Sequence, residues 1–212
     1  MNPQNNLHIR LEGLGKKFGT EWIFRKLNLD LSPGDKTVIL GGNGSGKSTL
    51  LQVISGYVLP NEGKVLYKNG QQAEESEKFK DHLSIATPYL ELIEDYTLTE
   101  LIDHCREYKP FISNLNTKEI IEIAGLAHTD KKYIKHYSSG MKQRVKLALA
   151  VLADCELLLL DEPTSNLDRN AIDWYNQLIL KFASHKTIIV CSNSVKEEFV
   201  FCEKALNMAD YK

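Results

Sequence analysis

Residues 41–48 carry residue types that bind nucleotide phosphates. The segment reads GGNGSGKS and fits the pattern G-x-x-x-x-G-K-[ST]. Glycines let successive backbone N–H groups curve around phosphate oxygens, the lysine reaches the β- and γ-phosphates, and the serine hydroxyl can bind Mg²⁺. A helix beginning near Lys47 would add its positive N-terminal end. The alternative is a glycine-rich turn before an ordinary helix, and the position of the loop between a predicted strand and a predicted helix disfavours it. The expected nucleotide site comprises Gly41, Gly42, Asn43, Gly44, Ser45, Gly46, Lys47, Ser48 and Thr49.

Two adjacent carboxylates follow an apolar run later in the chain. The run Leu157–Leu160 is short enough to be a buried parallel strand, and Asp161 and Glu162 come directly after it. Because ligands bind at the carboxyl ends of parallel strands, we expect both side chains beside the phosphate loop. Asp161 is then a ligand of Mg²⁺, and Glu162 is the general base that polarises an attacking water. The alternative is that the pair only caps a helix after Pro163.

Strand and helix patterns alternate around these groups, which predicts an α/β fold with a mostly parallel sheet core. Apolar runs at residues 36–40 and 187–191 are further strand candidates, and helical patterns lie between the runs. Alternating apolar residues near the N-terminus and the turn signal Asn69-Gly70 predict an antiparallel β edge. A more polar helical stretch at about 90–140 predicts an inserted helical subdomain. We therefore expect one domain over residues 1–212.

The composition excludes several classes of protein. The chain has 212 residues, with 26 basic and 28 acidic side chains and 42% hydrophobic residues, as in an ordinary globular domain. This near-neutral balance argues against nucleic acid as the main partner. The longest apolar run, Leu147–Ala153, is far shorter than the ~20 residues of a membrane-spanning helix. The polar N-terminus lacks the apolar core of a signal peptide. The 4 widely spaced cysteines predict reduced thiols of a cytosolic protein.

Three further segments carry a resemblance to a known family. Residues 137–144 read YSSGMKQR and resemble the LSGGQ signature of ABC ATPases. Residues 165–168 read SNLD and resemble the D-loop of that family, and Phe18 lies where the family places an aromatic ring that stacks on adenine. Together with the phosphate loop and the Asp-Glu strand, these motifs extend the resemblance over nearly the whole chain.

The resemblance implies a P-loop NTPase fold of the ABC type and a head-to-tail dimer, homodimeric or heterodimeric, that encloses two ATP molecules. It implies a Mg²⁺-dependent ATPase that powers transport through a separate integral membrane subunit, on the cytoplasmic face of the cell membrane. Asp168 would contact the opposite subunit or cap a helix, and Phe18 would stack on adenine or belong to the core. The γ-phosphate bound by the opposite subunit would touch Ser138, Ser139, Gly140 and Met141. The alternative is that Ser138-Ser139-Gly140 is a simple helix N-cap, and both roles can hold at once.

The chain departs from the family pattern at two positions. Tyr89 is the nearest equivalent of a glutamine that senses Mg²⁺ and water, and Asn193 replaces a histidine that contacts the γ-phosphate. Asn193 can donate a hydrogen bond but cannot become cationic, so we expect slower catalysis. The alternative is that Asn193 only caps a following helix. Two other functions stay open: a catalytically weak regulatory subunit and an ABC ATPase that acts outside transport.

Overall fold

The computed structural model describes residues 6–70, 72–74 and 78–212 and divides into two compact units. The first, called the sheet unit, comprises Met1–Leu83, Cys155–Glu162 and His185–Lys212. The second, called the helical unit, comprises Ser84–Asp154 and Pro163–Ser184. The chain therefore leaves and re-enters the sheet unit, and each unit is built from segments far apart in the sequence.

An antiparallel sheet forms the N-terminal part of the sheet unit. Its strand order is β2-β1-β4-β5, so the early strands form a sheet of their own. Alternate side chains of β1 are buried, because one face of this sheet packs on the core. The predicted turn at Asn69-Gly70 joins the last two strands, in which Asn69 pairs with Gln72. The strands are β1 (Leu7–Phe18), β2 (Glu21–Leu31), β4 (Glu62–Asn69) and β5 (Gln72–Glu74).

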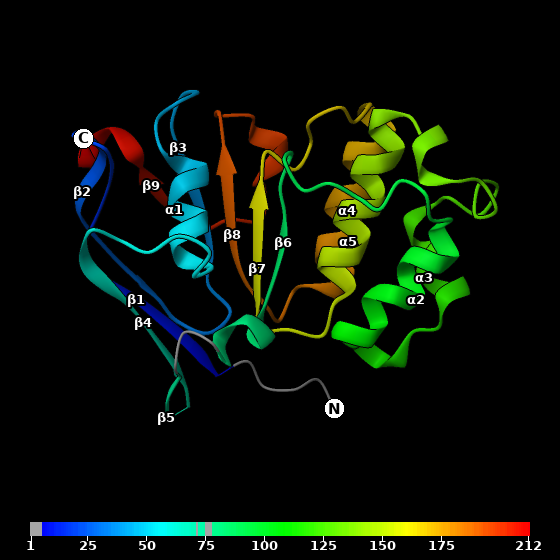
Figure 1. Ribbon diagram of the computed structural model, residues 1–212, viewed down its shortest axis with the longest axis horizontal. Coiled ribbons are helices and arrows are strands. Elements are labelled where there is room, and N and C mark those ends of the chain that lie inside the picture. The colour runs from blue at the N-terminus through cyan, green and yellow to red at the C-terminus, as the bar shows by residue number, and fades with distance from the viewer. Residues whose placement is uncertain (1–5, 71, 75–77) are drawn as a thin grey trace. The chain divides into compact units, whose positions relative to one another are not determined.

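Parallel strands form the other part of the sheet unit, in the order β7-β8-β3-β9. The arrows of β7 and β8 run in the same direction in Figure 1, and α1 (Lys47–Ile54) packs on them. Every residue of β7 and β8 is buried, which explains their uninterrupted apolar sequences. The predicted α/β class is confirmed, while the last strand was missed. The strands are β3 (Lys36–Leu40), β7 (Leu157–Asp161), β8 (Thr187–Ser192) and β9 (Lys204–Asn207).

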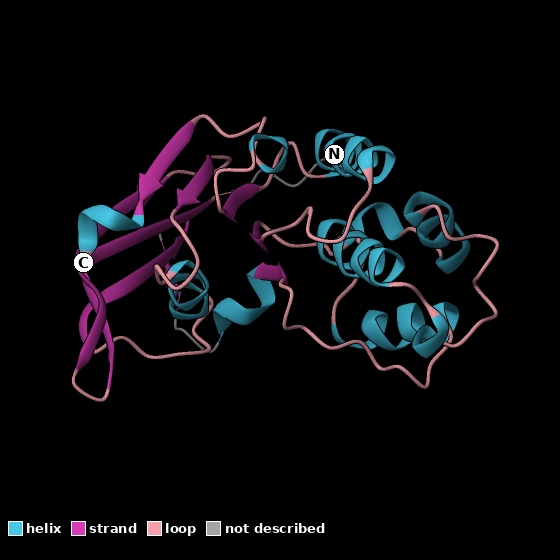
Figure 2. Cartoon of the chain, turned by 90° about the horizontal axis from the view of Figure 1, so that it is seen from above, coloured by secondary structure: helices cyan, strands magenta, loops and turns pink. Residues whose placement is uncertain are grey.

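The helical unit contains four α-helices, seen as cyan ribbons in Figure 2. The first two begin with capping boxes: the side chains of Thr97 and Asn116 accept from the backbone N–H of Glu100 and Glu119, and each glutamate carboxylate accepts in return from the N–H of the capping residue. Successive helices pack on each other through their apolar faces. The helices are α2 (Leu98–Tyr108), α3 (Thr117–Ala124), α4 (Ser139–Leu152) and α5 (Arg169–Phe182).

Short elements complete the described chain. Strand β6 (Leu83–Ala86) lies where the chain passes from one unit to the other. The 3₁₀ turns are η1 (Lys78–His82), η2 (Ile112–Asn114), η3 (Ile134–His136), η4 (Lys196–Glu198) and η5 (Met208–Tyr211).

Two predictions from composition can be compared with this fold. Within the described ranges, none of the helices has the length and apolar character needed to cross a membrane. The cysteines are free thiols, with Cys155 and Cys191 buried and Cys105 and Cys202 half-buried. The expectation of reduced cysteines agrees with this, although only two of them are fully buried.

Candidate nucleotide-binding site

The phosphate loop connects β3 to α1, and its shape depends on glycine. Gly44 and Gly46 have φ angles of 74° and 98°, which place both in the left-handed region. A Cβ on Gly46 would also lie 2.5 Å from Cγ2 of Ile23, so this glycine is required for space as well as conformation. The helix that follows begins at Lys47, as the sequence predicted.

Lys47 is held inside this loop. Its side chain is 5% exposed, and its Nζ donates hydrogen bonds to the carbonyl oxygens of Gly41 and Gly42 at 2.7 and 3.1 Å. A third bond, 2.6 Å long, runs to Oδ1 of Asn193, which follows β8. The ammonium therefore joins two segments that are far apart in the sequence.

Asn193 also contacts the carboxylate that was predicted to be the general base. Its Nδ2 donates to Oε1 of Glu162 at 2.8 Å and to Oδ1 of Asn43. The alternative that Asn193 caps a following helix is wrong, because the N-cap of the next helical turn, η4, is Val195, and Oδ1 of Asn193 accepts from Lys47. The structure thus brings together the side chains of Lys47, Glu162 and Asn193.

Glu162 occupies an unusual backbone conformation at the end of β7. Its φ is 44°, in the left-handed region that a non-glycine residue seldom adopts, and its N–H donates to the carbonyl of Cys191 at 2.9 Å. Such strain costs about 1–3 kcal/mol and concentrates at functional sites. The conformation turns the chain directly after Asp161 and directs the Glu162 carboxylate toward Asn193.

Asp161 is 2% exposed and bonds to the side chain of Ser48. Burial is the largest influence and raises the pKa of its carboxyl, while the bond from Ser48 acts in the opposite direction. The hydroxyl and the carboxylate are oxygen ligands, the type that Mg²⁺ prefers, and this cation usually takes one or two protein ligands together with phosphate oxygens. The pair Ser48 and Asp161 therefore fits the predicted cation site.

The signature segment lies in the helical unit and begins α4. Oγ of Ser138 accepts from the N–H of Met141 at 3.2 Å, so the helix-cap role is present. Ser138 and Ser139 are exposed, and Gly140 lies so close to the D-loop that an added Cβ would be 2.9 Å from the carbonyl of Asn166. The helix end thus presents polar groups to solvent next to the D-loop.

Asp168 ends the D-loop and caps α5. Its Oδ1 accepts from the N–H of Ala171 at 2.8 Å. The helix-cap alternative is therefore present in the structure, and a contact across a dimer stays a prediction.

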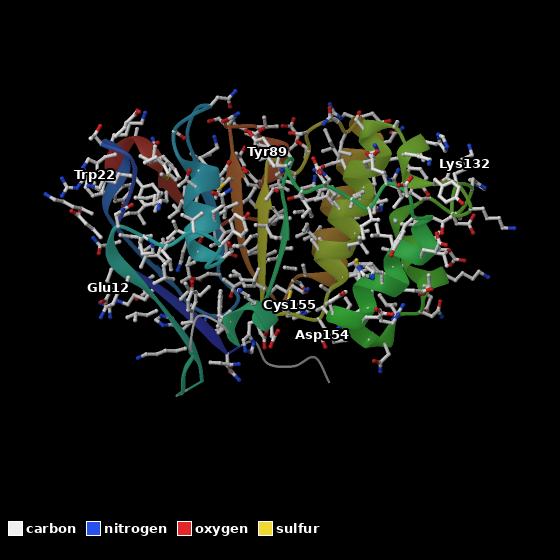
Figure 3. The ribbon with its side chains drawn as sticks, viewed as in Figure 1. Glu12, Trp22, Tyr89, Lys132, Asp154 and Cys155 are labelled. Carbon is white, nitrogen blue, oxygen red and sulfur yellow. The ribbon has the colours of Figure 1, made fainter. Side chains whose placement is uncertain are left out.

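Phe18 and Tyr89 are both exposed. Phe18 ends β1 with 54% of its surface exposed and Nζ of Lys16 5.0 Å from its ring centre, so the alternative that it is a core residue is wrong. Tyr89 is 80% exposed and is labelled in Figure 3. Either side chain is accessible to a ligand.

Comparison with known proteins decides the family. The family model described as "ABC transporter" matches residues 24–165. The chain belongs to the ABC transporter family. The resemblance to ABC ATPases is thereby confirmed, while the roles of the signature and D-loop residues stay predictions.

The proteins that resemble this ABC protein are as long as this chain or longer. The uncharacterized ABC transporter ATP-binding protein YdbJ of Bacillus subtilis is 30% identical over 93% of this chain, which spans 65% of YdbJ. The lantibiotic transport ATP-binding protein SrtF of Streptococcus pyogenes is 27% identical over 90% of this chain and 81% of its own length. The dimeric structure of MJ0796, described as a bacterial ABC transporter cassette, is 26% identical with a TM-score of 0.77, over 94% of this chain and 93% of its own.

Proposed function

We propose that this ABC protein binds ATP together with Mg²⁺ at residues 41–49 and hydrolyses it to power transport through a separate integral membrane subunit. The observation that carries the proposal is the meeting of Lys47, Glu162 and Asn193 beside the phosphate loop. Phosphate chemistry needs a cation, a general base and a hydrogen-bond donor close together, and these side chains supply all three.

Each residue then has a definite part in the reaction. Backbone N–H groups of the loop and Lys47 bind the phosphates, and the exposed ring of Phe18 stacks on adenine. Glu162 takes a proton from water as the water oxygen bonds to the γ-phosphorus and the bond to the ADP oxygen breaks. Asn193 donates a neutral hydrogen bond to the γ-phosphate. Ser48 and Asp161 would hold Mg²⁺, which when bound neutralises phosphate charge.

The second half of the site comes from another subunit in this proposal. The N-terminus of α4, a helix of 14 residues, is exposed and carries serine hydroxyls, which together suit an anion. Two copies, or this chain and a related one, would associate head to tail on ATP, with Asp168 at the contact. The γ-phosphate bound by the opposite copy would then meet Ser138, Ser139, Gly140 and Met141. The dimer would lie on the cytoplasmic face of the membrane, and we expect no nucleic acid partner.

Two departures from the family pattern favour a second candidate, a catalytically weak subunit that binds ATP and pairs with an active partner. Asn193 is neutral where the family has histidine, and Tyr89 offers a hydroxyl where the family has an amide. Replacing Asn193 by histidine would distinguish the two candidates. If Asn193→His hydrolyses ATP faster in a single turnover, the site is active and the asparagine limits its rate. If neither protein hydrolyses ATP, the regulatory subunit is favoured.

Association on ATP tests the main proposal. Glu162→Gln should bind ATP without cleaving it, so that a dimer accumulates. Static light scattering of this variant with and without ATP and Mg²⁺ measures the mass directly. A mass that stays monomeric at saturating ATP contradicts self-association and points to a different partner subunit.

A further inference from the structure

Lys47 and Asn193 form a closed set of hydrogen bonds. The ammonium of Lys47 has three N–H groups, and three acceptors surround it: two loop carbonyls and Oδ1 of Asn193. The carboxamide nitrogen of Asn193 has two N–H groups, which donate to Glu162 and Asn43. Each N–H of the two groups therefore has an acceptor that the protein itself supplies.

A phosphate oxygen can bind Lys47 only if it takes the place of one of these acceptors. The carbonyls of Gly41 and Gly42 belong to the loop backbone, where Gly42 also accepts from the N–H of Ser45 at 3.2 Å. Oδ1 of Asn193 belongs to a side chain and can leave by rotation about two bonds. It is the acceptor that the phosphate would displace.

Asparagine suits this position because its two ends differ. The oxygen accepts from a cation while the nitrogen donates to a carboxylate, so one carboxamide can link Lys47 to Glu162. A carboxylate could not donate to Glu162, and an ammonium could not accept from Lys47. The turn after β8 supports the arrangement, since the N–H of Val195 donates to Oγ of Ser192 at 3.2 Å.

We propose that Asn193 competes with nucleotide phosphates for Lys47 and thereby lowers the affinity of the phosphate loop for ATP and ADP. The proposal rests on the proposed function, because it requires that Lys47 binds phosphate. Asn193 acts here as a positioning residue that holds Lys47 and Glu162 in one arrangement. It differs from a phosphate ligand in the sign of its effect on affinity, since removing a competitor tightens binding and removing a ligand weakens it.

Equilibrium titration with fluorescent ADP and a fluorescent non-hydrolysable ATP analogue tests the proposal. Asn193→Ala should bind ADP about tenfold more tightly than the unchanged chain, an effect of the size of one hydrogen bond to a charged group. The ATP analogue should also bind more tightly, but by less, because its γ-phosphate loses the hydrogen bond from Asn193. Asn43→Ala should give a smaller tightening, because it removes only a bond that orients the Asn193 carboxamide. The matched control is Asn170→Ala, an exposed asparagine of α5 in the helical unit, which should leave both affinities unchanged.

The opposite results overturn the proposal. Weaker binding of the ATP analogue with unchanged ADP binding would make Asn193 a γ-phosphate ligand only, and unchanged affinities would remove its role at Lys47. Asn193 is exposed, so its loss should leave the core intact, and thermal unfolding of the variant checks this. Asn193→Ser, too short to span both groups, should repeat the tightening. Failure of the proposed function would give a different result. In that case the unchanged chain would bind neither nucleotide, or Lys47→Ala would bind both nucleotides with the same affinity as the unchanged chain.

Discussion

The sheet unit and the helical unit differ in how they hold the polar groups to which we assign phosphate binding and hydrolysis. In the sheet unit, Lys47, Asp161 and Glu162 are charged groups with partners from several distant segments, and the first two are almost completely buried. In the helical unit, Ser138 is an exposed polar residue whose partner is the backbone of its own helix.

The difference has a physical origin. Burying a charged side chain costs free energy unless the charge is paired, so the buried charges of the sheet unit require hydrogen-bond partners from other segments. A helix N-terminus offers partial positive charge to solvent with no such network. We infer that the sheet unit provides affinity and chemistry, while the helical unit recognises a phosphate only when another molecule presents one.

The largest expected effect is the loss of the carboxylate base in the sheet unit. Glu162→Gln should lower the rate of ATP hydrolysis about 10²- to 10⁴-fold, because the amide cannot take a proton from water. ATP affinity should stay within a few-fold, since the amide oxygen can still accept from Asn193. Phosphate release and nucleotide titration measure the two quantities. The control is Glu122→Gln on the exposed face of α3, and equal hydrolysis by both variants would exclude Glu162 as the base.

Removal of the buried ammonium should have the next largest effect. Lys47→Ala is expected to weaken ATP binding about 10- to 100-fold, the size of one or two hydrogen bonds to a charged group. Equilibrium titration measures the change, and Lys131→Ala, an exposed lysine of the helical unit, serves as control. Nucleotide affinity that does not respond to the loss of Lys47 would contradict the phosphate-loop assignment.

A negative charge introduced at the helix end separates the two roles of Ser138. Ser138→Asp keeps a good helix cap and adds a favourable charge at the N-terminus of α4, so thermal stability should be maintained. Its carboxylate would repel a γ-phosphate held by another subunit, and hydrolysis should fall about tenfold, the size of one lost favourable contact. ATP binding by the isolated chain should not change. If this variant hydrolyses ATP at the full rate, Ser138 is a cap and nothing more.

The smallest expected effect concerns the stability of the sheet unit. Burial raises the pKa of Asp161 above its value in the unfolded chain, so ionisation of this carboxyl opposes folding once the pH exceeds that of an ordinary aspartate. Asp161→Asn should therefore raise the unfolding temperature at pH 7.5 by about 1–3 °C. The gain should shrink as the pH falls toward 4, because the carboxyl with its raised pKa is protonated progressively in the folded chain and then no longer opposes folding. Thermal unfolding at both pH values measures this difference, and a lower unfolding temperature at pH 7.5 would show that the ionised form is stabilising.

Much of the site could be predicted because its parts are local in the sequence. The phosphate loop, the Asp-Glu pair and the signature are short runs, and their residue types alone indicate the chemistry that they could perform. The strand candidates were also readable, because strands buried on both faces such as β7 and β8 are continuously apolar. Strand β9 was missed because its sequence Lys204–Asn207 is short and mostly exposed.

What the sequence alone determined is the set of chemical groups, their order and the alternation of strands and helices, since each depends on neighbours within a few positions. Only the tertiary structure decided which of these groups meet. Asn193 lies 146 residues from Lys47 and 31 from Glu162, and the bonds among them follow from the order β7-β8-β3 of the parallel sheet. Strand order and the left-handed turn at Glu162 arise from packing of the whole chain, where burial and long-range hydrogen bonds outweigh local preference.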